Sequence, residues 1–92
     1  MRNSIELSIP LALGDGRIVQ TIQCKLTADY FEGYAKDGIK KGETILLDFV
    51  IGSAGRMTDS IRREYIITHA HPEICEKEPC TWFMAVPRGA PA

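Results

Sequence analysis

Alternation of apolar and polar residues is the clearest pattern at the start of the chain. Every second position from residue 5 to residue 13 is apolar, namely Ile5, Leu7, Ile9, Leu11 and Leu13. This period of two is typical of a strand with one buried face. Because Pro10 has no N–H group to donate, we expect the strand to lie at a sheet edge or to bulge there.

A second strand is predicted after the turn at Gly14-Asp15-Gly16, whose glycines tolerate positive φ angles. Alternation over residues 17–26 predicts an inward face of Ile18, Ile22, Cys24 and Leu26. The same alternation predicts an outward face of Arg17, Val19, Thr21, Gln23 and Lys25. The two segments therefore form a predicted β-hairpin, with Cys24 as a small core residue.

The next segment carries the signals of a helix. Thr27 suits an N-cap position, and Asp29 would lie in the first turn, where the helix dipole favours a negative charge. An apolar stripe at helical spacing follows, made of Tyr30, Phe31, Tyr34 and Ala35. Gly38 then provides a natural end, so we predict one helix here.

The remaining apolar segments predict more strands. Residues 45–51 form an almost continuous apolar run that suits a central strand, although a buried helix has the same composition. Gly52-Ser53-Ala54-Gly55 interrupts it. Residues 60–71 alternate as a strand, with helix as the alternative for residues 59–66. Pro72 and Pro79 bracket a predicted loop or single helical turn, and Thr81 to Val86 make a last strand.

Together these segments predict an α+β fold in the order β-β-α-β-β-β. An antiparallel sheet of four or five strands would be packed by one main helix. With 92 residues the chain has room for one core. We expect a single domain over residues 1–86 and a flexible tail over residues 87–92, which are rich in Pro and Gly.

Composition and charge narrow the function classes. Eleven basic and twelve acidic residues give a net charge of −1, which argues against strong non-specific DNA binding. No apolar run approaches the ~18 residues of a membrane span. Three cysteines without an export signal favour a reducing cytoplasm. A monomeric cytoplasmic protein without a cofactor is therefore the expectation.

One stretch concentrates the residues that could carry chemistry. Both histidines and two of the three cysteines lie between Thr68 and Cys80. Zinc accepts two imidazoles and two thiolates, so a structural zinc site is one interpretation, with His69, His71, Cys75 and Cys80 as ligands. The spacing is uncommon for zinc, and the alternative is strand-end histidines with loop cysteines. A Cys75–Cys80 disulfide would not suit the expected compartment, and we favour no metal.

Residues 68–73 resemble the T-H-x-H-x-D-H box of metallo-β-lactamase-fold hydrolases. Glu73 stands where that family has aspartate, and Ile74 where it has its third histidine. The other ligands of the family are missing, and a catalytic zinc needs three protein ligands. No serine–histidine–acid spacing, phosphate-binding loop or catalytic carboxylate pair is evident either, so we expect no catalytic residues and no enzyme activity.

Residues 50–64, V-I-G-S-A-G-R-M-T-D-S-I-R-R-E, resemble the core of a KH domain. The resemblance implies a loop between Gly52 and Gly55 that clamps a nucleic-acid backbone between helices, with Arg56 near the phosphates. Thr58 replaces an apolar position of the family, and no third helix follows Val86. The alternative to this single-stranded RNA-binding interpretation is a glycine turn between two strands.

Basic residues gather in two groups that could contact acidic protein or RNA phosphates, namely Lys36, Lys40, Lys41 and Arg56, Arg62, Arg63. In its small size and lack of catalytic motifs the whole chain resembles phage-encoded anti-CRISPR inhibitors. That resemblance implies a non-enzymatic protein that docks on a multi-subunit bacterial RNA-guided complex and blocks its binding to target DNA. Contact with the guide-RNA backbone is part of the same expectation.

Overall fold

The computed structural model describes the backbone of residues 5–53 and 56–89, and the side chains of residues 8–48 and 61–89. Seven antiparallel strands account for most of these residues. They are β1 (Ile5–Leu7), β2 (Pro10–Leu13), β3 (Ile18–Leu26), β4 (Phe31–Ala35), β5 (Thr44–Ser53), β6 (Arg56–Cys75) and β7 (Glu78–Pro87). Within the described ranges there is no helix, and therefore no helix that could cross a membrane.

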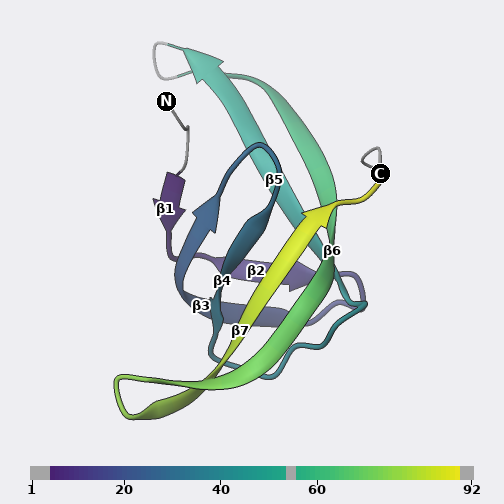
Figure 1. Cartoon of the computed structure of the whole chain (residues 1–92). Helices are drawn as coiled ribbons and strands as arrows, with labels where there is room; N and C mark the ends of the chain where they lie inside the picture. Colours follow the sequence, from purple (N-terminus) through teal and green to yellow (C-terminus); the bar gives the residue numbers. More distant parts are fainter. Residues whose placement is uncertain (1–4, 54–55, 90–92) are drawn as a thin grey trace.

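The strands close into an antiparallel barrel with six positions (Figure 1). β1 and β2 share one edge of β3 and together occupy one position, while β4 pairs with the other edge of β3. The ring continues through β7, β6 and β5, and β5 returns to β2 at Ala12 and Leu46. Closure removes most of the free strand edges that an open sheet exposes. The predicted α+β fold is therefore wrong.

The helix predicted after Thr27 is the strand β4. Thr27 does cap backbone groups, but in a turn: its Oγ1 accepts hydrogen bonds from the N–H groups of Asp29 at 3.2 Å and Tyr30 at 3.1 Å. The same side-chain chemistry serves helix caps and such turns. After the turn, Phe31 and Ala35 are fully buried while Tyr34 faces outward. A period of two thus replaces the expected helical stripe.

A bulge explains why the predicted inward face of the second strand is partly wrong. Gln23 has a φ angle of 66°, and the pairing with β4 shifts between Thr21 and Cys24. The extra residue inverts the alternation. Cys24 is buried as predicted, but before the bulge Val19 is buried and Ile18 is 60% exposed. The first predicted hairpin is otherwise confirmed.

β6 is longer than predicted, because Pro72 and Pro79 do not bracket a loop. They pair with Thr81 and Ile74 in the β6–β7 hairpin, whose turn is formed by Glu76 and Lys77. Both turn residues have positive φ angles, of 50° and 69°, as tight hairpins with a right-handed twist require. β4 covers β7 only from Thr81 to Ala85, so the tip of this hairpin projects beyond the barrel (Figure 1).

The barrel interior is filled by apolar side chains from the described strands. Phe83 and Phe31 lie 5.5 Å apart between ring centroids, and Phe31 and Tyr65 lie 6.1 Å apart. Around them pack aliphatic side chains that include Leu11, Leu13, Val19, Ile45, Leu47 and Ile67. Ile39, from the connection between β4 and β5, is also buried and helps to cover one end.

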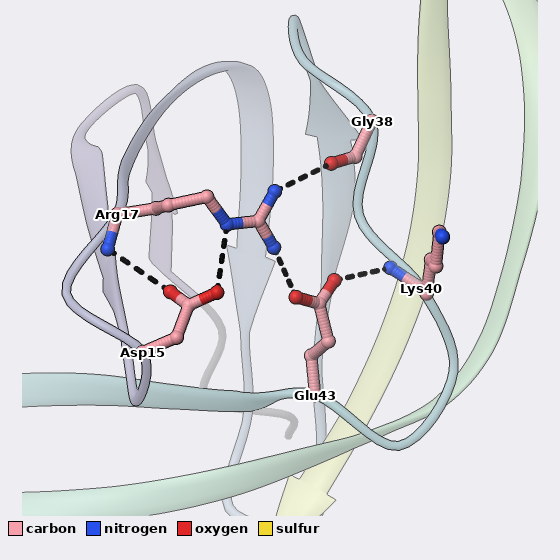
Figure 2. A network of polar contacts seen from close by, with 5 residues as sticks. All are labelled: Asp15, Arg17, Gly38, Lys40 and Glu43. Atoms are coloured by element: carbon pink, nitrogen blue, oxygen red, sulfur yellow. Dashed lines mark hydrogen bonds and ion pairs between the residues drawn. The ribbon is translucent and has the colours of Figure 1, made fainter.

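A polar network ties two connections together at this end of the barrel (Figure 2). The Nε of Arg17 donates to Asp15 at 2.9 Å, and its terminal nitrogens donate to the Gly38 carbonyl and to Glu43. Glu43 also accepts from the backbone N–H of Lys40 at 2.6 Å. The backbone N–H and the guanidinium of Arg17 hold the pKa of Asp15 below its ordinary value. The network fixes the loop that precedes β5.

Candidate functional site

The outer surface of β4, β7 and β6 carries a row of aromatic side chains. Tyr34 pairs with Trp82 across β4 and β7, and Trp82 pairs with His71 across β7 and β6. Directly opposed residues point to the same side of a sheet. That side is the outer one, because the neighbouring Phe83 and Ala85 are fully buried. The rings of His71 and Trp82 are 4.9 Å apart at an angle of 32°.

A second row runs beside the first. Register places Lys25, Glu32, Met84 and His69 in line across β3, β4, β7 and β6. His69 also approaches Trp82, with 6.4 Å between ring centroids. We call the surface made by these two rows the aromatic face, defined by Lys25, Glu32, Tyr34, His69, His71, Trp82 and Met84.

The aromatic face is hollowed where β3 and β4 meet. A depression of about 290 Å³ is lined by Tyr34, Trp82 and the polar side chains of Lys25 and Glu32, with Gly33 also at its wall. The bulged residue Gln23 also lines it. Apolar rings beside a few polar groups are the usual composition of a recognition surface.

Both histidines of the aromatic face have polar neighbours on their own strand. His71 Nδ1 lies 3.0 Å from a carboxylate oxygen of Glu73, and His69 Nδ1 lies 3.0 Å from the Thr68 hydroxyl. Both imidazoles are exposed. Across the described residues, no group of three or more His, Cys, Asp and Glu side chains converges as a metal site would require. Stacking and hydrogen bonding are what the arrangement offers.

The four residues considered as zinc ligands are not brought together. Cys75 and Cys80 form a disulfide across the hairpin tip, with Cα atoms 6.2 Å apart. His71 precedes Cys75 by four residues on a continuous strand, a separation of roughly 13 Å. Imidazole and thiolate arms on one zinc ion span less than that, with Zn–N and Zn–S bonds of about 2.0–2.3 Å. His69 is farther still.

The Cys75–Cys80 disulfide, which the expected compartment did not favour, is present in the structure. Cys24 is the one thiol, and burial raises its pKa. Disulfides persist in oxidising compartments. The cytoplasmic location stays a prediction.

Replacing both Cys75 and Cys80 with Ser is expected to cost about 1–2 kcal/mol of unfolding free energy, because the bridge closes a very short loop. The loss should be local, since the bridged tip lies beyond the strands covered by β4. Urea denaturation measures the total change. Amide hydrogen exchange should show lost protection around Glu73–Cys80 and unchanged protection in β2 and β5. Loss of protection throughout the barrel would contradict this assignment.

The basic residues singled out from the sequence do not form one patch. Lys36, Lys40 and Lys41 lie on the connection between β4 and β5 and are exposed. Arg62 and Arg63 pair with Asp48 and Leu47, which places them roughly 10–13 Å along β5 from its first residue. As neighbours on a strand they also face opposite sides.

Arg62 is already engaged: its Nε donates to Asp48 at 2.8 Å, and this contact lowers the pKa of Asp48. Arg56 opens β6 opposite Ser53, but its side chain lies outside the described residues. Gly52 and Ser53 thus end β5, and they pair with Met57 and Arg56 at the start of β6. The helical fold that the KH resemblance implied is wrong, since Gly52 and Arg56 belong to strands rather than to a loop between helices. Single-stranded RNA binding stays a prediction.

Sequence reasoning missed Tyr34 and Trp82 as candidate site residues. The alternation of residues 69–71 and 82–84 already places each pair on one face of its strand. The cross-strand register that joins them cannot be read from alternation, and Tyr34 was assigned to a helix. Comparison with known proteins adds no further residue: no family model, curated protein or solved structure matches this chain.

Proposed function

We propose that the protein is a non-enzymatic binding module that docks on a larger partner through the aromatic face. The observation that carries the proposal is the row of Tyr34, Trp82 and His71 on the outside of the barrel. These side chains are not needed to fill the core, which has its own aromatic cluster. Trp and Tyr are enriched among the residues that dominate binding energy in protein interfaces.

Rigidity supports the same proposal. The three side chains stand on paired strands of a closed barrel rather than on loops, so little conformational entropy is lost when a partner covers them. Tyr34 and Trp82 are half-buried. The adjoining depression of about 290 Å³ can receive a protruding side chain of the partner.

For the partner we propose a bacterial RNA-guided surveillance complex, as the resemblance to anti-CRISPR inhibitors implies. Its acidic protein surfaces and guide-RNA phosphates would suit the exposed lysines of the β4–β5 connection. Pull-down with purified complexes of each type tests the partner. Failure to retain the protein on any of them would contradict the partner but not the docking face.

Replacing Trp82 with Ala is expected to weaken docking on the retained complex at least tenfold, because an interface tryptophan at a hot spot contributes about 2 kcal/mol or more. Ile18→Ala is the matched control: Ile18 is 60% exposed but lies outside the aromatic face. Surface plasmon resonance would give both affinities, and circular dichroism would show that both variants are folded. If the Trp82→Ala variant bound the complex as tightly as the unmodified protein, the aromatic face would not be the docking surface.

A further inference from the structure

A hollow at the C-terminal end of β3, on the opposite side of the sheet from Lys25, combines apolar and polar side chains as small-ligand sites do. It has a volume of about 270 Å³ and is lined by Leu26, Thr27, Ala28, Ile61, Arg63 and Tyr65. Leu26 packs on the core and Tyr65 is 3% exposed, so the floor of the hollow is continuous with the barrel interior. Ile61, at 41% exposure, remains open to solvent.

Arg63 is placed unusually for a charged residue. It opposes Leu47 and lies two residues before Tyr65, and both of those side chains are buried. Alternation therefore puts Arg63 on the inner face of β6, at the rim of the hollow. Its neighbour Arg62 points to the outer face and contacts Asp48.

Arg63 also differs from the other described arginines in its partners. Arg17 contacts Asp15 and Glu43, and Arg88 lies 3.3 Å from Glu64. Within the described side chains, Arg63 contacts no carboxylate. A guanidinium presents a planar set of donors that matches a carboxylate in two parallel hydrogen bonds. The one described arginine that contacts no described carboxylate thus stands beside this hollow.

We propose that this hollow binds an aliphatic carboxylate, with the hydrocarbon chain against Leu26, Ile61 and Tyr65 and the carboxylate on Arg63. Burial against apolar side chains stabilises the hydrocarbon chain of the ligand. Hydrogen bonds from the Arg63 guanidinium replace those that the carboxylate loses with water. The size of the hollow favours a chain of medium length. The site is independent of the aromatic face and of the proposed partner.

Octanoate is the probe that tests the site, with octanol and octylamine as ligands of equal chain length and different charge. Titration followed by amide chemical shifts should show saturable changes confined to residues 26–28 and 61–65. Octanoate should bind at least tenfold more tightly than octanol, and octylamine should not bind. Equal binding of octanoate and octanol, or changes spread over the whole barrel, would overturn the proposal.

Two arginine variants separate the specific contact from general charge. Arg63→Gln should weaken octanoate binding about tenfold and bring it close to that of octanol. Arg62→Gln removes the same charge one residue away, on the opposite face, and should leave octanoate binding unchanged. Both residues are exposed, and the amide spectrum of each variant reports its fold directly. An equal loss of octanoate affinity in both variants would show that octanoate is attracted by the general positive charge and not by a specific site. That result would overturn the assignment.

Discussion

Replacing Phe83 with Ala is expected to lower the free energy of unfolding by about 3–5 kcal/mol, the usual cost of truncating a buried phenylalanine. Phe83 is fully buried and lies 5.5 Å from Phe31 at the centre of the aromatic cluster. The barrel strands that surround it are hydrogen-bonded on both sides and cannot collapse fully into the cavity. For a domain whose total stability is about 5–15 kcal/mol, this change leaves little reserve.

Met84→Ala is the matched control for Phe83→Ala. Met84 is the next residue on β7 but faces outward and is only half-buried, so its truncation should cost about 1 kcal/mol or less. Phe83→Leu, which leaves a smaller cavity, should fall between the two. Urea denaturation followed by circular dichroism gives all three values. Similar losses for Phe83→Ala and Met84→Ala would contradict the assignment of inner and outer faces on β7.

Gly33→Ala is expected to destabilise the barrel by about 3 kcal/mol, at the upper end of the usual cost of overpacking. A methyl group at Gly33 would lie 2.6 Å from the Cys24 sulfur, 2.8 Å from the Gln23 carbonyl oxygen and 2.9 Å from the Cys24 Cα. Two of these three atoms belong to the backbone of the bulge. The bulge would therefore have to move, and its movement would disturb the pairing of β3 with β4.

Gly38→Ala provides the comparison for Gly33→Ala. No atom lies within 4 Å of a methyl group at Gly38, so its effect should stay within about 0.5 kcal/mol. Adding Cys24→Ala to Gly33→Ala removes the sulfur but not the backbone contacts, and should not restore stability. Thermal unfolding of the variants measures each effect. Full rescue by Cys24→Ala would show that the sulfur, and not the bulge, requires glycine.

Much of the strand content could be predicted from alternation alone. The segments around Leu11, Ile45 and Tyr65 carry a period of two because each has one face in the core. Residues 31–35 also alternate in burial, but Tyr30, Phe31 and Tyr34 are spaced like the apolar stripe of a helix. Thr27 adds an ambiguous signal, since its hydroxyl caps a turn as readily as a helix. The helix prediction failed because the competing signals are local and similar in strength.

The candidate site was less predictable than the fold. The histidines and cysteines between residues 68 and 80 were the strongest candidates in the sequence, because those side chains carry reactive groups. The structure separates them along one strand, and it joins His71 instead to Trp82 and Tyr34 from other strands. Likewise, the basic residues looked like one class, but Arg62 and Arg63 differ in face and in partner. These distinctions depend on the register between strands, and residues far apart in the chain determine that register.

The sequence by itself determined that the segments around Leu11, Val19 and Tyr65 are extended, because alternation follows from the geometry of a single strand. It also determined the turn at Gly14–Gly16 and the small buried cysteine at position 24. Only the tertiary structure decided that the sheet closes into a barrel, that a bulge at Gln23 inverts one face of β3, and that Tyr34, Trp82 and His71 form one row. Each of these depends on pairing between distant strands, and no local pattern encodes which partner a strand will find.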